Sequence, residues 1–328
     1  MEPQRLLSID GGGIRGILPL CQLVELERVT GKLTQKSFKF VAGTSVGAII
    51  AAGVAAGIPA TELLDLFIKL AGEVFTQRPW NQFIRLVSGH MYSITRLNNM
   101  LREALGNSAD LTLNDLPIDL LVTAVRVKDG KPWYFVKDCG LNSQRTGHLK
   151  LVDCVTASAA APTYFAPWTM PEDPAAYAGH GPIGTLVDGG VSVTGNPVYQ
   201  ACVEAFYYTG DKDQRNRYDP ANTIVVSLGT GSFLDRHPPT WLGSWLSWLL
   251  AEMLRSPSEQ QTEIVRRHFT QTRCLRINPR LQEDIQLDDA RQLPHLLQQG
   301  NQLAAGIKWP EILAGDFSSF ESDRRFVS

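Results

Sequence analysis

The chain has 328 residues, of which 44% are hydrophobic and 20% charged, an ordinary composition for a globular protein with a sizeable core. Its formal net charge of −2 excludes a global basic bias toward nucleic acid or anionic lipid. The five scattered cysteines form no C-x-x-C pair, which favours a reducing compartment and argues against a disulfide framework or a zinc site.

The first strands and helices alternate along the chain. In order, we expect a strand at 5–9, a helix at 17–30, a strand at 38–42, helices at 48–56, 60–71 and 94–105, and a strand hairpin at 118–127 and 133–137. The aromatic-rich segment 76–92 is irregular and is a candidate lid or cap.

The second half continues the alternation. We expect a helix at 152–161, a loop at 171–184, a strand at 185–187, a helix at 197–208, a strand at 223–228, helices at 241–254 and 258–269, a strand at 273–277 and a helix at 290–304. This order predicts an α/β fold, with a mainly parallel central sheet flanked by helices.

Neither the N-terminus nor the uncharged stretch 40–59 indicates a membrane protein. No basic segment precedes an apolar run, so we expect no signal peptide and a cytoplasmic protein. The uncharged stretch 40–59 is long enough to suggest a membrane span, but it is rich in Ala and Gly. It divides instead into a strand, a turn and a helix that should be buried on all sides.

A glycine loop follows the first strand. Gly11-x-Gly13-x-x-Gly16 fits the dinucleotide-binding pattern, yet the second strand ends in Ala42-Gly43, where that pattern needs an acidic residue. The loop lacks the Lys-Ser/Thr pair of a phosphate-binding P-loop. A sugar-kinase loop of the actin-like fold and a plain tight turn are the other interpretations.

The segment Gly43-Thr44-Ser45-Val46-Gly47 is a G-x-S-x-G turn between a predicted strand and a predicted helix. That context holds a serine nucleophile on a sharp bend, although Thr44 or Ser45 could simply cap the helix. A nucleophile needs a base, and no histidine follows a strand beside glycines; His180 and His237 are outside candidates.

Asp188 is the stronger candidate base, because it follows a short strand and precedes two glycines. A desolvated carboxylate can take a serine proton directly. The alternative is an Asp-Gly turn with no catalytic role, which is common.

Taken in order, Asp10-Gly-Gly-Gly-Ile-Arg-Gly16, Gly43-Thr-Ser-Val-Gly47 and Asp188-Gly-Gly190 resemble the motifs of the patatin-like phospholipases. Supporting stretches lie at 157–165, 196–197 and 227–231, so the resemblance runs from about Leu6 to Gly231. It implies a three-layer patatin-like fold. We expect one domain over 1–328, with a core at 5–231 and a C-terminal lid or regulatory extension at 232–328.

By this resemblance, Ser45 and Asp188 form a Ser–Asp dyad. The N–H groups of Gly11, Gly12 and Gly13 would bind the oxyanion, and Arg15 would support the loop. The implied activity is a phospholipase A or lysophospholipase type of acyl hydrolysis, through a covalent acyl-enzyme and without metal or cofactor. The chain departs from many relatives at Gly195-Asn196-Pro197, where they have Asn-Asn-Pro.

Two alternatives remain. The opening Leu7–Pro19 also resembles compact bacterial members that cyclic nucleotides activate in phage defence, which implies the same chemistry under control of a cyclic nucleotide. The other is a nucleotide-binding module that uses the loop Gly11–Gly16. Expected partners are a transiently contacted phospholipid membrane surface, a cyclic-nucleotide activator and further copies of the chain, but no nucleic acid polymer.

Two features of the C-terminal third fall outside the resemblance. The stretch Trp241–Leu254 carries Trp and Leu on one face, which fits either a lipid-docking helix or lid or a packed core or dimer helix. A loose basic cluster is either a solvated face or an anion or nucleotide site. Its members are Arg266, Arg267, Arg273, Arg276 and Arg280.

Overall fold

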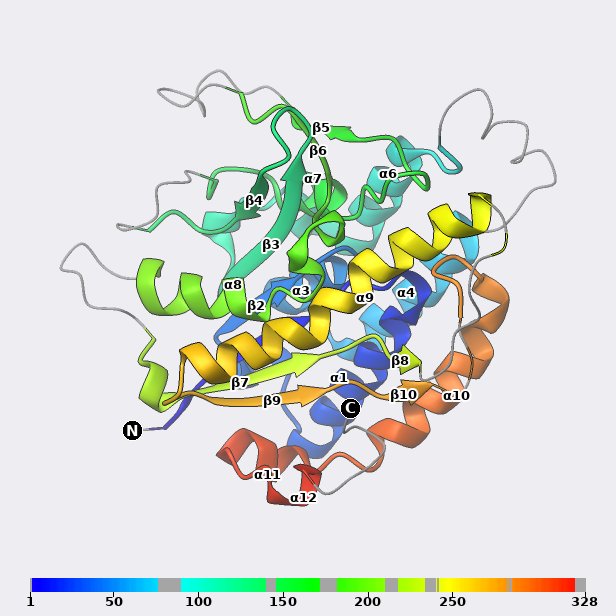
Figure 1. Cartoon of the computed structure of the whole chain (residues 1–328). Helices are drawn as coiled ribbons and strands as arrows, with labels where there is room; N and C mark the ends of the chain where they lie inside the picture. The colour runs from blue at the N-terminus through cyan, green and yellow to red at the C-terminus, as the bar shows by residue number, and fades with distance from the viewer. Residues whose placement is uncertain are drawn as a thin grey trace.

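An eight-stranded mixed sheet runs through the centre of the molecule (Figure 1). The computed structural model describes residues 2–75, 90–139, 146–171, 182–209, 218–233, 240, 242–281, 283 and 285–321. The strands are β1 (Gln4–Ile9), β2 (Phe40–Gly43), β3 (Asp119–Arg126), β4 (Pro132–Phe135), β5 (Trp168–Thr169), β6 (Thr185–Asp188), β7 (Thr223–Leu228) and β9 (Arg273–Ile277). Their order is β5-β6-β3-β2-β1-β7-β9, with β4 paired to β3.

The strands β3, β2, β1, β7 and β9 are parallel to one another, as expected for strands joined by helical crossovers. Strands β4 and β6 run antiparallel to β3, and β5 runs antiparallel to β6. A separate two-stranded ribbon pairs β8 (Ser232–Phe233) with β10 (Arg280–Leu281).

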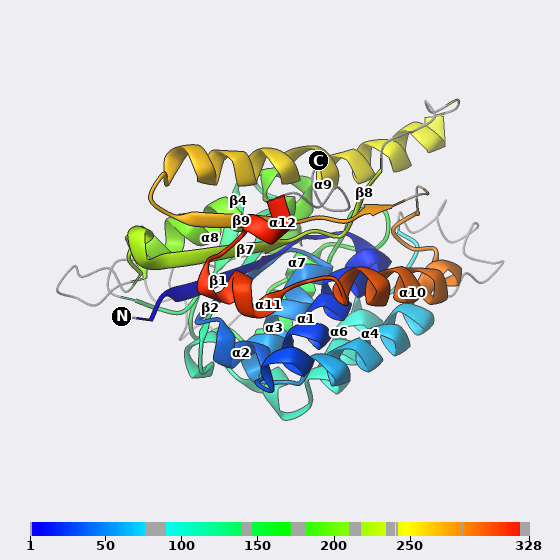
Figure 2. The same cartoon turned by 90° about the horizontal axis from the view of Figure 1, so that it is seen from below.

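Helices cover both faces of the sheet, and Figure 2 shows α8 and α9 on one face and α1, α3, α4, α6 and α10 on the other. The helices are α1 (Ile17–Thr30), α2 (Thr34–Ser37), α3 (Val46–Ala56), α4 (Ala60–Val74), α6 (Ile94–Leu105), α7 (Leu151–Ser158), α8 (Val198–Val203), α9 (Leu242–His268), α10 (Leu293–Ala304), α11 (Trp309–Ala314) and α12 (Ser318–Glu321).

Alternation along the strands divides the core into two apolar clusters. In β1, Leu7 and Ile9 belong to the cluster under α1 and α3, whereas Leu6 belongs to the cluster under α8 and α9. Strands buried on both faces are typical of parallel sheets. The predicted three-layer α/β fold with a mainly parallel sheet is therefore confirmed.

Most predicted elements agree with the structure. The helices expected at 17–30 and 94–105 match α1 and α6, and Gly31 ends α1 in the left-handed region with φ 64°. Most of the candidate lid 76–92 and of the loop 171–184 lies outside the described residues. No helix in the described ranges combines the length and the apolar content needed to cross a bilayer.

One prediction about the helices is wrong. The two helices expected at 241–254 and 258–269 are a single helix, α9, which continues through Pro257. Proline lacks an N–H and disfavours a helix interior, so the sequence indicated a break there. Tertiary contacts just beyond it outweigh this local preference, because Asn196 Nδ2 donates to the Ser258 carbonyl at 2.8 Å and Val265 is buried against the sheet.

Candidate active site

Ser45 lies on a strained turn between β2 and α3. Its backbone has φ 57° and ψ −124°, a conformation that non-glycine residues rarely adopt. A Cβ on Gly43 would lie 2.1 Å from the Gly47 carbonyl oxygen, so the strand and the helix can pack this closely only around glycine. The Ser45 N–H donates to Ser158 Oγ at 2.9 Å, which fixes the turn from α7. The strand–turn–helix context expected for the G-x-S-x-G motif is confirmed.

The register of the sheet places Asp188 near Ser45. Strand β3 pairs Val122 with Gly43 of β2 and, two residues further on, Ala124 with Asp188 of β6. Both motifs therefore end beside the same short piece of β3. Ser45 and Asp188 both line one pocket, and their side chains interact.

The Asp188 carboxyl group is 2% exposed, and this burial raises its pKa to about 6. The Ser45 side chain and the Gly190 N–H act in the opposite direction and lower the pKa of Asp188. Oδ1 accepts the Gly190 N–H at 2.7 Å. Oδ2 is buried and has no well-formed hydrogen bond among the described residues. It can therefore accept a proton from Ser45.

The glycine loop forms another wall of the site. Gly13 has φ 56° and lines the pocket, and no acceptor is found in the described structure for the N–H of Gly12 or of Gly13. Arg15 is buried, donates from Nε to the Gly12 carbonyl at 3.4 Å and lies over the Phe233 ring. Arg15 therefore contacts the glycine loop through the Gly12 carbonyl.

The structure corrects the expectation for Gly11. Its N–H donates to the Gly195 carbonyl oxygen at 2.9 Å, so it does not point free into the site. The turn at Gly195-Asn196-Pro197 thus braces the glycine loop through a backbone carbonyl, which needs no particular side chain at position 195.

The pocket in front of these groups is apolar. It holds about 590 Å³ of free space, its open mouth included. Besides the polar groups above, its walls include Val46, Ile49, Phe67, Leu70, Leu97 and Phe165. None of the lining residues is a histidine, and the outside candidates His180 and His237 lie beyond the described residues. Within the described ranges, no cluster of three His, Cys, Asp or Glu side chains could hold a metal ion.

The comparisons agree with this arrangement of motifs. The family model described as "Patatin-like phospholipase" matches residues 7–202, well over half of the chain. The chain belongs to the patatin-like phospholipase family.

Relatives of this patatin-like chain include two bacterial proteins named "cGAMP-activated phospholipase". The one from Vibrio cholerae is 36% identical over 177 residues, which cover 50% of this chain and 49% of the relative. The one from Escherichia coli is 32% identical over 237 residues, which cover 70% of this chain and 62% of the relative. The chain thus spans less than two thirds of these relatives' own length. Among solved structures, VipD from Legionella pneumophila aligns with 95% of this chain and 67% of its own, at 13% identity and a TM-score of 0.43.

Two contributors to the site lie beyond the residues that the family model matches. Leu287 lines the pocket, and its carbonyl oxygen accepts the Ile14 N–H at 2.9 Å. Arg276 is 7% exposed and forms a two-point ion pair with Asp10, at 2.9 and 2.6 Å. For Arg276, the solvated-face interpretation of the basic cluster is therefore wrong. The sequence does indicate a buried pair, because Arg276 lies inside an apolar strand-like run, where a charged side chain needs a partner.

Proposed function

We propose that this patatin-like chain is a serine acyl hydrolase that cleaves phospholipid esters with Ser45 as nucleophile and Asp188 as base. One observation carries the proposal. A serine on a strained strand-to-helix turn interacts with a buried carboxylate at the end of an apolar pocket. Nucleophile, base and a place for an acyl chain are thus adjacent.

In the first step, Ser45 Oγ bonds to the acyl carbon while Asp188 takes the hydroxyl proton. With a pKa of about 6, Asp188 is ionised at neutral pH yet more basic than an exposed aspartate. The N–H groups of Gly12 and Gly13 donate to the oxyanion. Collapse of the intermediate breaks the ester bond, and Asp188 returns the proton to the departing alcohol oxygen.

In the second step, Asp188 takes a proton from water as the water oxygen attacks the acyl-Ser45 ester. The Ser45 oxygen leaves and regains a proton, and a free fatty acid departs. The negative charge of each tetrahedral intermediate lies on the acyl oxygen, beside the N–H groups of Gly12 and Gly13.

The pocket walls indicate the substrate. Leu, Ile, Val and Phe side chains surround the space in front of Ser45, which suits a fatty acyl chain better than a polar acyl group. We infer transient contact with a phospholipid surface, because the acyl ester must be drawn from a bilayer into this pocket.

The test measures fatty acid released from mixed phospholipid vesicles by the wild type, Ser45→Ala and Asp188→Asn. Ser108→Ala, a serine of the short 3-10 turn Gly106–Asp110, is the matched control. We expect both dyad variants to lose at least about a thousandfold in rate, because members of such a unit are each essential. Full activity in Ser45→Ala would contradict the dyad.

A second candidate is the same chemistry under control of a cyclic dinucleotide. Two relatives at 36% and 32% identity are named as cGAMP-activated, and this favours it. The vesicle assay is therefore run with and without cGAMP. Ser45-dependent release that requires cGAMP supports a ligand-gated effector, and equal release in both arms supports a constitutive hydrolase.

A nucleotide-binding role for Gly11–Gly16 is less well supported. The Gly11 N–H is already bonded within the protein, and a Cβ on Gly12 would lie 2.2 Å from Thr230 Oγ1, so protein packs closely around the loop. Thermal protection by nucleotides, retained in Ser45→Ala, would reverse this order of preference.

A further inference from the structure

A row of polar side chains crosses the face of the sheet beneath α9. Ser8 of β1 pairs in register with Ser227 of β7, and Ser227 pairs with Arg276 of β9. Two residues earlier in each strand, the same face is apolar and buried, at Leu6, Val225 and Cys274. The apolar pattern thus stops in all three strands at the same level, next to the glycine loop.

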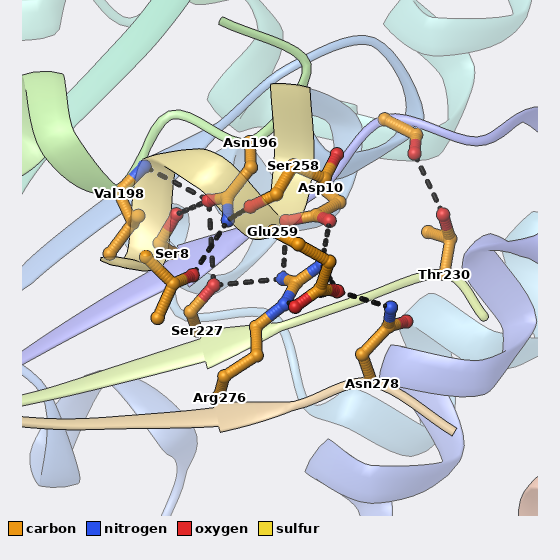
Figure 3. A network of polar contacts seen from close by, with 12 residues as sticks. Ser8, Asp10, Asn196, Val198, Ser227, Thr230, Ser258, Glu259, Arg276 and Asn278 are labelled. Carbon is orange, nitrogen blue, oxygen red and sulfur yellow. Dashed lines mark hydrogen bonds and ion pairs between the residues drawn. The ribbon is translucent and has the colours of Figure 1, made fainter. Parts of the chain in front are cut away.

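Arg276 organises this row (Figure 3). Its two terminal nitrogens bind the two Asp10 carboxylate oxygens, and Nη1 also donates to Ser227 Oγ at 2.9 Å. Two-point Arg–carboxylate pairs fix geometry as well as charge. Because Asp10 directly precedes Gly11, Arg276 fixes the position of the residue at which the glycine loop begins.

Helix α9 joins the network through Glu259. Its Oε1 accepts from Arg276 Nε at 3.3 Å and from Asn278 Nδ2 at 2.7 Å. Asn278 Oδ1 in turn accepts the Gly231 N–H at 2.9 Å.

Thr230, the residue before Gly231, connects the network to the glycine loop. Thr230 Oγ1 donates to the Gly11 carbonyl at 2.8 Å. One carboxylate on α9 therefore reaches the loop by two routes. The first runs through Arg276 to Asp10, and the second through Asn278 and the 230–231 turn to Gly11.

We propose that Glu259 is a positioning residue, which links the placement of α9 to the geometry of the Gly12 and Gly13 oxyanion donors. This inference rests on the proposed function. Glu259 does not touch the pocket, so its effect on rate passes through Asp10 and Gly11. Oxyanion donors act on the charge formed in the transition state, so a shifted loop lowers kcat and leaves KM nearly unchanged.

The structure offers matched variants on one helix. Glu259→Ala removes both routes, whereas Glu259→Gln keeps an oxygen that accepts from Asn278 and Arg276. Glu263→Ala is the control, because Glu263 lies one turn further along α9, is half-exposed and, within the described residues, pairs with Arg267 at 2.7 Å and not with the network. Thr230→Val breaks the second route at its far end without touching α9.

The experiment measures kcat and KM on a soluble 4-nitrophenyl ester, with and without cGAMP, together with the melting temperature. We expect Glu259→Ala to lower kcat about tenfold, since even a displacement of about 1 Å in an active site can cost about 100-fold. Glu259→Gln should recover most of that loss, Glu263→Ala should match the wild type, and Thr230→Val should lower kcat with KM unchanged.

Failure of the inference differs from failure of the proposed function. If the wild type shows no Ser45-dependent hydrolysis in any arm, the proposed function fails and the inference falls with it. If the wild type is active but Glu259→Ala has the kcat of Glu263→Ala, the inference alone is overturned. Should Glu259→Ala not fold, a normal kcat in folded Thr230→Val, or a KM that rises in that variant, overturns it.

Discussion

Burial makes the Asp188 carboxylate more basic, and it also lowers the stability of the folded protein. Its pKa is raised from 3.8 to about 6 by burial, so the ionised form is disfavoured in the folded state. A difference of this size corresponds to about 3 kcal/mol of lost folding free energy at pH values above 6. Below about pH 4 the carboxyl group is protonated in both the folded and the unfolded states, and the cost disappears.

Asp188→Asn should therefore be inactive and yet more stable than the wild type at neutral pH. Asparagine keeps the acceptor for the Gly190 N–H but carries no charge, so we expect a gain of up to about 3 kcal/mol. Denaturant unfolding between pH 4 and 8 measures it. The gain should be full above pH 6 and shrink as the pH falls toward 4, and a gain that is independent of pH would contradict this origin.

The pH profile of activity tests the same group. The free enzyme needs Asp188 ionised, so kcat/KM should fall as the pH is lowered through about 6. Burial also raises the pKa of Asp10 to about 6, and its ion pair with Arg276 needs the ionised form. The slope of log kcat/KM against pH should therefore exceed one at low pH, and a flat profile between pH 5 and 7 would contradict the assigned base.

Local motifs point to some of the residues that the structure brings together around the pocket, and they do not point to others. Ser45 and Asp188 follow strands and stand beside glycines, so their positions can be inferred from short segments. The bond from Gly11 to Gly195 and the Asp10–Arg276 pair join segments far apart in the chain. No local pattern indicates which carbonyl will accept a given N–H, so the partner of the Gly11 N–H could not be foreseen from the sequence.

At the scale of elements, α9 combines two different halves. Its C-terminal half packs on the sheet and carries Glu259, whereas Trp245 and Leu249 near its start are 45% and 49% exposed. Trp245 also packs edge-on against Trp248, with ring centroids 5.6 Å apart. Exposed Trp and Leu four residues apart form an apolar face, which argues against a packed core helix for Trp241–Leu254 and is compatible with a lipid-docking face or a dimer face.

Replacing Trp245 and Leu249 together with Ala should weaken the attachment to vesicles. Burial of two large side chains contributes several kcal/mol to the free energy of membrane binding. We therefore expect vesicle hydrolysis to fall by roughly tenfold or more. Hydrolysis of a soluble ester should be unchanged, because neither side chain lines the pocket. Flotation of the protein with vesicles measures binding directly.

Ile264→Ala is the control for this prediction, because Ile264 is 40% exposed on the same helix but lies in its C-terminal half. Equal losses in the double variant and in Ile264→Ala would show that general exposure of α9, and not this face, governs the vesicle reaction.

Helices and strands were predictable where one pattern dominated. Small and apolar residues define α3, and apolar runs define β1 and β7. The continuity of α9 was not predictable, because Pro257 argues for a break and the contacts that oppose it, from Asn196 and from the sheet, come from distant segments. The antiparallel run of β6 against β3, which places Asp188, also depends on a pairing between distant segments.

At the scale of the whole molecule, the C-terminal third belongs to the same sheet as the core. Strand β9 pairs with β7 along five residues, and α10 packs against α1. We propose that 1–328 fold as one domain, in which 232–328 complete the site. Arg276 and Leu287 both come from that segment and contact Asp10 and Ile14.

A chain ending at Gly231 should consequently fail to fold into an active protein. It would remove Arg276, the ion-pair partner of Asp10, together with α9, which lies over the same carboxylate. It would also expose the edge of β7 and the apolar faces of Leu6 and Val225, which favours aggregation. Soluble expression, circular dichroism and ester hydrolysis measure the outcome, and a chain ending at Glu321, which keeps β9 and α10, is the control. A folded 1–231 chain that hydrolyses esters faster than the full chain would instead identify 232–328 as an inhibitory lid, and the brace from Arg276 to Asp10 would then be dispensable for catalysis.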